Sequence, residues 1–282
     1  QIAHKKNQVI LSLEKLNEIK FYKKSNLLKV QSGAILSSVK SIALNNGRLF
    51  PLTLASEGSC QIGGNLATNA GGLNVIKYGN VRDLCLGLEA VLPSGKILSS
   101  MKSLKKNNMG FDLKNLLIGS EGTLGIITSA ILKTFPIPKN PVSVFFSVNN
   151  LKDVLVIFEK ISELFQDRIL AFELIKNTGI NFIKETGFLI NNPFTKNTTW
   201  MVLMEIDVNI GPISLKESVE QILYDFILSN KIVEVFIANT LNQRDEFWKI
   251  RELIPSANRR KGSICSNDIS VPVEKIPEFG FG

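Results

Sequence analysis

A proline-rich segment divides this chain of 282 residues into two parts with different patterns. The segment PIPKNP runs from Pro136 to Pro141, and prolines disfavour both helix interiors and central strands. We therefore expect an extended linker between two domains, residues 1–138 and 139–282. The length suits this division, because domains commonly contain about 100–200 residues.

The part after the linker alternates apolar strands with helical segments. Strands are predicted at VSVFFSV, ILAFELI, TTWMVLMEIDV and VEVFIA. Helices are predicted at residues 150–165, 179–184, 214–228 and 243–258, and one more begins near KIPEFGFG. This alternation is typical of a small layered domain whose helices pack on one face of a sheet.

The part before the linker mixes short strands with short helices. Two strands, VILSLEKLNEIKF and LLKVQSG, flank the turn KKSN, and a helix is predicted at residues 35–43. A strand pair joined by Pro-Ser-Gly follows within residues 80–99, where Gly95 can take a positive φ without steric cost. A short helix and a β-branched strand at residues 126–128 complete this part.

The segment Gly58–Gly72, GSCQIGGNLATNAGG, has five glycines among fifteen residues and no charged residue. Glycine lets a main chain approach a ligand closely and aim its N–H groups at a phosphate. Asn65, Thr68 and Asn69 add short side chains that can donate to phosphate or ring oxygens. The spacing matches neither a Walker A loop nor the Rossmann fingerprint. An irregular glycine-rich connection explains the spacing about as well.

A second segment of the same kind, GSEGTLGIIT, covers Gly119–Thr128. It contains Glu121, which we expect to be a buried carboxylate that needs a partner. Two such segments within one domain indicate a loop pair that binds a long ligand.

Charge and hydropathy exclude several classes of partner. Lys and Arg outnumber Asp and Glu by 33 to 25, but the basic residues are scattered without interleaved aromatic residues, so nucleic-acid binding is not expected. No apolar run is long enough for a membrane span, and the N-terminal residues lack the pattern of a signal peptide.

Cysteine and histidine content restricts the chemistry. Three widely spaced cysteines fit neither a disulfide framework nor a zinc motif, which indicates a reducing compartment, the cytoplasm or, in a eukaryote, the mitochondrial matrix. His4 is the only histidine, so the sequence holds no HExxH motif and no histidine cluster for a metal. We assign no catalytic residue and no metal ligand in this chain.

Four longer motifs carry a family resemblance. They are FPLTLASEGSCQIGGNLATNAGG, YGNVRDLCLGLEAVLPSGKIL, GFDLKNLLIGSEGTLGIIT, and RELIP with DISVPV near the end. Together they resemble FAD-linked oxidases of the p-cresol methylhydroxylase and vanillyl-alcohol oxidase type, within them the D-2-hydroxyglutarate and D-lactate dehydrogenase group. The resemblance implies an α+β fold, in which residues 1–138 form the second part of the FAD-binding domain and residues 139–282 an incomplete, ferredoxin-like substrate (cap) domain.

The resemblance also implies site residues. Contacts with FAD are expected along both glycine segments, from Pro51, Ser59, Gly63, Gly64, Asn65, Thr68, Asn69, Gly71, Gly72, Tyr78, Gly79, Glu121, Gly122, Gly125 and Ile126. Arg251 is expected to bind the substrate carboxylate with its planar guanidinium. Without the family resemblance, the simpler interpretation of Arg251 is a charged residue on the surface of a helix.

The implied reaction is FAD-dependent oxidation of a D-2-hydroxy acid, of the D-2-hydroxyglutarate, D-lactate or glycolate type, to the 2-oxo acid. Electrons would pass to an electron-transfer flavoprotein or a quinone-type acceptor. Family members also carry a Pro-Gly-Gly-Gly-rich loop before the first strand and, after the cap, histidines and a glutamate that bind a divalent metal such as Zn. Neither segment is in this chain, and Ser266 stands where a lysine is usual.

These departures lead us to expect an internal fragment that lacks complete catalysis. A non-catalytic, flavin-binding remnant is the alternative from another class. A non-flavin oxidoreductase or a nucleotide-sugar reductase of the same superfamily is a further alternative.

Overall fold

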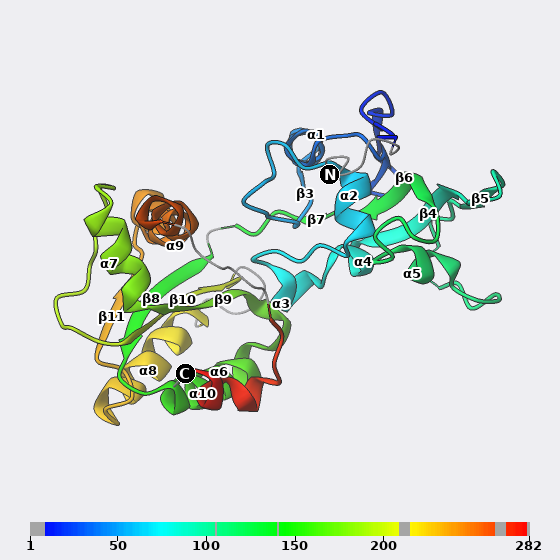
Figure 1. Ribbon diagram of the computed structural model, residues 1–282. Helices are drawn as coiled ribbons and strands as arrows, with labels where there is room; N and C mark the ends of the chain where they lie inside the picture. The colour runs from blue at the N-terminus through cyan, green and yellow to red at the C-terminus, as the bar shows by residue number, and fades with distance from the viewer. Residues whose placement is uncertain (1–8, 105, 140, 209–214, 263–268, 281–282) are drawn as a thin grey trace. The chain divides into compact units, whose positions relative to one another are not determined.

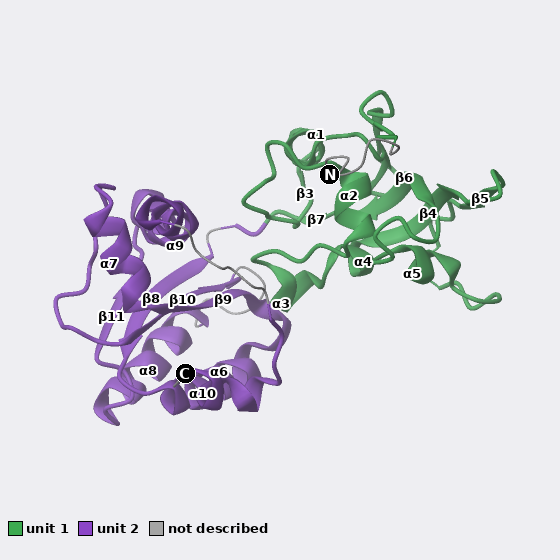
Figure 2. Ribbon diagram, viewed as in Figure 1, with its two compact units in different colours: residues 1–137 green, residues 138–282 purple. Residues whose placement is uncertain are grey.

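A computed structural model describes residues 9–104, 106–139, 141–208, 215–262 and 269–280 (Figure 1). The chain divides into two compact units, Gln1–Ile137 and Pro138–Gly282, shown in green and purple in Figure 2. The division lies within the proline-rich segment. Both units combine helices with antiparallel sheets, as the α+β prediction requires.

Unit 1 is built on a five-stranded antiparallel sheet in the order β1-β2-β6-β4-β5. Its strands are β1 Ile19–Tyr22, β2 Leu27–Gln31, β4 Cys85–Val91, β5 Ile97–Ser100 and β6 Ile126–Lys133, with a separate pair of β3 Arg48–Leu49 and β7 Phe135–Pro136. Its helices are α1 Leu36–Asn45, α2 Ile62–Ala67, α3 Val75–Tyr78, α4 Val81–Leu84 and α5 Leu113–Leu117. The predicted hairpin is confirmed as β4 and β5, and Gly95 has a φ of 79°.

Unit 2 has a four-stranded antiparallel sheet in the order β11-β8-β10-β9. Its strands are β8 Val142–Val148, β9 Ile169–Lys176, β10 Trp200–Ile206 and β11 Glu234–Ile237. Its helices are α6 Leu151–Phe165, η1 Gln166–Arg168, α7 Asn177–Glu185, α8 Leu215–Leu228, α9 Leu241–Lys261, η2 Val273–Lys275 and α10 Ile276–Phe279. The fourth strand of the unit, β11, lies beside the first, β8, and the third, β10, lies between β8 and the second, β9. This order confirms the ferredoxin-like topology.

Helices cover both faces of the unit 2 sheet, so the prediction of a single covered face was wrong. Figure 1 shows α6, α8 and α10 on one side and α7 and α9 on the other. Val144 and Phe146 pack in the core that includes α6 and α8, while the ring of Phe145 lies 4.7 Å from that of Phe194 and 5.5 Å from that of Phe247. All seven residues of β8 are consequently buried.

The predicted first strand was too long. Residues 9–18 lie outside the sheet, and Val9 is 94% exposed. Pairing begins only at Ile19, opposite Val30, so the apolar residues of VILSL do not reach the core. The linker also departs from expectation, because Pro136 pairs with Arg48 in a two-stranded ladder before the chain leaves unit 1.

Among the described residues, no helix is both long enough and apolar enough to cross a membrane.

Candidate functional site

The centre of the first glycine segment is a helix, which corrects the expectation of a loop there. In α2, Ile62 and Leu66 are fully buried and stand four residues apart, one above the other on the core side. Gly64 and Thr68 lie at the same spacing on the exposed side. Burial of the two large residues overrides the poor helix propensity of the glycines.

Close packing accounts for two of the glycines. A Cβ at Gly63 would lie 2.6 Å from Cβ of Ser32, and one at Gly72 would overlap the carbonyl oxygen of Thr53. At Gly64, by contrast, a Cβ would meet no atom within 4 Å. The glycines of this segment therefore serve different purposes. Gly63 and Gly72 let a neighbouring segment of the chain pack closely, whereas Gly64 borders open space.

The second glycine segment docks on the C-terminal end of α2. The backbone N–H of Gly119 donates to the carbonyl of Leu66 over 3.0 Å, and that of Glu121 donates to the carbonyl of Ala67 over 2.9 Å. Both residues have positive φ, 84° and 52°. The two segments thus meet. Glu121, expected to be a buried carboxylate, is exposed.

Arg82 fixes this junction, a role that the sequence analysis missed. Its Nη1 donates to the carbonyl of Asn115, and its Nη2 donates to that of Ile118 over 2.5 Å. Its backbone N–H donates to Oδ1 of Asn69 over 3.2 Å. Arg82 therefore links the first segment, through its backbone N–H, to the residues just before the second segment, through its guanidinium. Only its place after the Asn80 helix cap hinted at such a role.

The expected FAD contacts fall into three groups by exposure. The exposed members are Ser59, Gly64, Thr68, Gly71, Glu121 and Gly122. The half-buried members are Asn69, Gly72, Tyr78, Gly79 and Ile126. The buried members are Pro51, Gly63, Asn65 and Gly125. The exposed residues can meet a ligand directly, whereas the buried ones support the surface from behind.

The exposed group consists of small and polar residues and one carboxylate, that of Glu121. It runs from Ser59, in a pocket of about 500 Å³ that also contains Gln61, along α2 to the second segment. A Cβ at Gly64 or Gly122 would meet no atom within 4 Å, so this side of the unit is open. The small residues and hydroxyls of this group suit a ring and phosphates.

In unit 2, Arg251 lines a pocket of about 420 Å³ between β9, the start of α7 and α9. Its Nε donates to Oε2 of Glu173 over 2.8 Å. Arg251 makes no other ion pair or hydrogen bond within the described ranges, so both Nη groups remain available to a ligand. The residue expected to bind a carboxylate therefore has a pocket in front of it.

A second charge network of unit 2 is centred on a buried carboxylate. Glu205 on β10 is 3% exposed and accepts hydrogen bonds from Arg244, Trp248 and Ser143 at 2.5, 2.8 and 2.6 Å. Burial would lower the pKa of Arg244, but the hydrogen bonds and charge of Glu205 outweigh it and raise the pKa. Sequence reasoning missed this network, although a glutamate within an apolar strand was its signal.

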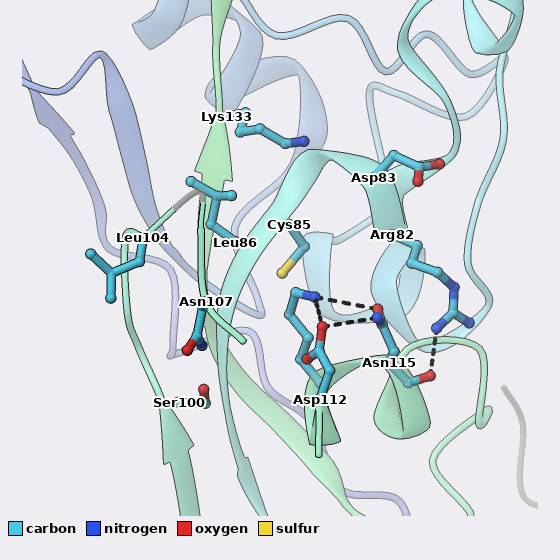
Figure 3. A pocket seen from close by; sticks show the side chains of 11 residues that line it. Arg82, Asp83, Cys85, Leu86, Ser100, Leu104, Asn107, Asp112, Asn115 and Lys133 are labelled. Atoms are coloured by element: carbon cyan, nitrogen blue, oxygen red, sulfur yellow. Dashed lines mark hydrogen bonds and ion pairs between the residues drawn. The ribbon is translucent and has the colours of Figure 1, made fainter. Parts of the chain in front are cut away.

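A third pocket, of about 250 Å³, lies in unit 1 and contains none of the expected site residues (Figure 3). Lys114 bridges Asp112 and Asn115 there, at 2.5 and 3.4 Å. Cys85 lines the same pocket, and burial raises the pKa of its thiol from 9.0 to about 12, despite the nearby charge of Lys114. In the part of the chain that the structure describes, no group of three His, Cys, Asp or Glu side chains could hold a metal.

We predict that Cys85 resists alkylation. Only the thiolate reacts, and the folded protein keeps this thiol protonated at pH 8. Iodoacetamide should modify half-buried Cys60 at least ~10-fold faster than Cys85, measured by mass spectrometry of the peptides. The stability linked to protonated Cys85 is present below pH 9.0 and is lost as the pH rises through about 12. As a control, Cys60 and Cys85 should be alkylated at equal rates in urea. Equal alkylation rates in the native protein would contradict the burial of Cys85.

Comparison with known proteins places the chain in a family. Residues 2–100 match a family described as an FAD binding domain, and residues 137–280 match FAD linked oxidases, C-terminal domain. The chain belongs to the FAD-linked oxidases. The family resemblance and the fold class, an FAD-binding part followed by an FAD-linked oxidase C-terminal domain, are thereby confirmed.

Relatives of this chain include the mitochondrial D-2-hydroxyglutarate dehydrogenase of Arabidopsis thaliana, 32% identical over 96% of this chain and 48% of the relative. A D-2-hydroxyglutarate–pyruvate transhydrogenase of Saccharomyces cerevisiae is 31% identical over 96% of this chain and 54% of the relative. The chain thus spans about half the length of these relatives. An alkyldihydroxyacetonephosphate synthase structure shares the fold, with a TM-score of 0.64 and 18% identity over 87% of this chain and 46% of that one.

Proposed function

We propose that this chain is part of an FAD-dependent dehydrogenase that oxidises a D-2-hydroxy acid to the 2-oxo acid. In this proposal unit 1 is the second part of the FAD-binding domain, and unit 2 is an incomplete cap domain. The observation that carries the proposal is Arg251, which lines a pocket of about 420 Å³ and whose Nη groups are bonded to no described residue. The names of the relatives, which specify D-2-hydroxyglutarate, support this substrate class.

Arg251 is the proposed anchor for the substrate carboxylate. A guanidinium is planar and always charged, and it donates two parallel hydrogen bonds to a carboxylate. Ile175, Phe182 and Ile254 form the apolar side of the pocket. FAD, when bound, supplies the two-electron acceptor for the oxidation.

The proposed cofactor surface is the exposed side of α2 with the second glycine segment. Gly64 and Gly122 leave room for the cofactor, and Ser59, Thr68 and Gly71 extend the same exposed surface. Glu121 and the half-buried Asn69 border it at the junction of the segments. The buried Pro51, Gly63, Asn65 and Gly125 hold this surface in shape.

The proposed reaction also needs an electron acceptor and a cellular compartment. An electron-transfer flavoprotein or a quinone-type acceptor would receive the electrons, and the mitochondrial matrix is the proposed location because the relatives are named mitochondrial. The divalent metal that the resemblance implies belongs to the same proposal, with no ligand assigned in this chain. The competing candidate is a non-catalytic flavin-binding chain, favoured by the single histidine of the sequence.

We predict that Gly64→Ala weakens FAD binding without weakening the fold. The methyl group would occupy the open space beside α2, where it meets no protein atom within 4 Å. Alanine in a helix is favoured over glycine by about 0.5–1 kcal/mol, so the melting temperature of unit 1 should stay or rise. FAD affinity should fall about tenfold, equivalent to about 1.4 kcal/mol, in a flavin fluorescence titration.

The control is Asn45→Ala, which places alanine at another exposed helical position of unit 1, the end of α1, outside the expected contacts. Unchanged FAD affinity in Gly64→Ala would contradict the proposed cofactor surface. Wild-type chain that binds FAD but whose flavin is not reduced by D-2-hydroxyglutarate or D-lactate would favour the non-catalytic candidate.

A further inference from the structure

We propose that Glu173 is a positioning residue that orients the guanidinium of Arg251 for a carboxylate ligand. This inference rests on the proposed function, in which Arg251 anchors the substrate. Glu173 would not itself contact the carboxylate that binds.

The ion pair joins two different elements of unit 2. Glu173 lies on β9, an edge strand whose backbone is paired with β10, and Arg251 lies on α9. Their side chains are 22% and 31% exposed, and Nε of Arg251 lies 2.8 Å from Oε2 of Glu173. A charge-assisted bond of this length, shielded from most of the solvent, restricts the long arginine side chain to one orientation.

The choice of nitrogen determines which edge of the guanidinium remains for a ligand. A carboxylate can pair with a guanidinium along the Nε edge or across its two Nη groups. Glu173 occupies Nε, and no other described residue bonds to Arg251. The two Nη groups therefore form the remaining fork, which can bind one carboxylate bidentately.

The other positive charge at the pocket, that of Lys176, does not replace the two Nη groups of Arg251 as a carboxylate anchor. Lys176 also lines the pocket, but its Nζ lies 5.4 Å from the centre of the Trp200 ring. Trp200 packs with the core that includes α6, on the opposite sheet face from α9, and side chains of neighbouring strand positions alternate between faces. The lysine is thus directed away from Arg251, which leaves Arg251 as the one anchoring cation among the described residues that line the pocket.

Glu173 has two separable effects on such a ligand. Its hydrogen bond orients Arg251, whereas its negative charge opposes a second carboxylate nearby. Glu173→Gln keeps an oxygen that can accept from Nε and removes the charge. Glu173→Ala removes both, and Arg251 regains its rotamer freedom.

The test measures binding of D-2-hydroxyglutarate and of D-lactate to the full chain by titration calorimetry. Glu173→Ala should raise Kd about tenfold, while Glu173→Gln stays within about threefold of wild type or binds more tightly. In ¹⁵N NMR, the Nε–H signal of Arg251 should be protected from exchange in wild type and Glu173→Gln and lose protection in Glu173→Ala. A purely stabilising role would lower the melting temperature but leave both Kd and this pattern unchanged.

Two control variants separate the inference from the function on which it rests. Glu185→Ala removes another ion pair of α9, the 2.5 Å pair with Lys261, but lies outside the pocket lining and should not change Kd. Loss of binding in Arg251→Ala together with wild-type Kd in Glu173→Ala would overturn the positioning role and leave the anchor intact. Equal binding in Arg251→Ala, or no binding by wild type, would overturn the anchor and this inference together.

Discussion

Replacing Glu205 with alanine is expected to destabilise unit 2 by about 3–5 kcal/mol, the usual cost of removing one partner of a buried ion pair. Arg244 would lose two bonds, at 2.5 and 3.2 Å, and the indole N–H of Trp248 would lose its acceptor at 2.8 Å. Because the Arg244 side chain is 34% exposed and water can reach it, we expect the lower part of this range.

Urea unfolding followed by tryptophan fluorescence measures this change in unit 2 alone, since Trp200 and Trp248 are the only tryptophans of the chain. Glu205→Gln is the matched control, because the amide still accepts from Trp248 and Ser143 and should cost less. A midpoint in Glu205→Ala within error of wild type would show that this network does not hold α9 to the sheet.

Gly72→Ala is expected to destabilise unit 1 by about 2–3 kcal/mol, the usual cost of inserting a group where the chain cannot yield. The new Cβ would overlap the carbonyl oxygen of Thr53 and lie 3.0 Å from its carbonyl carbon, and backbone cannot rotate away as a side chain can. The segment would have to shift, together with the N–H of Leu73, which donates to the same oxygen over 3.4 Å. FAD binding should weaken with it.

Amide hydrogen exchange is the suitable measurement, because the unit contains no tryptophan. Protection should fall across the five-stranded sheet, while the fluorescence transition of unit 2 stays in place as an internal standard. Gly64→Ala provides the comparison, since the same change there meets open space. If the two variants showed equal protection, the contact with Thr53 would not be the reason for glycine at position 72.

Sequence patterns predicted unit 2 well where hydrophobic periodicity and length agreed. The helix predicted at residues 150–165 is α6, and the strand VSVFFSV is β8. The same strand also signalled burial on both faces, since its apolar run does not alternate, but the prediction allowed for one face only. Partners of individual charges, such as Glu173 with Arg251, depend on register between distant segments and could not be predicted.

In unit 1 the errors have a common physical cause. Local propensity gave residues 62–67 as a loop and residues 9–13 as a strand, and tertiary contacts decided otherwise in both places. Ile62 and Leu66 gain a core, whereas Val9 finds no partner strand. The sequence showed two glycine segments but not their contact, and Arg82, which lies at their junction, carries no distinctive motif.

The strand order of unit 2 also bears on how the protein is made. β8 lies in the middle of its sheet, yet both of its neighbours, β10 and β11, come later in the chain. A ribosome therefore releases the uncharged segment VSVFFSV long before residues 234–237 can cover its second edge. Such a segment is prone to intermolecular β-pairing while it waits. A chaperone that shields β8 until then would thus favour soluble protein over aggregates.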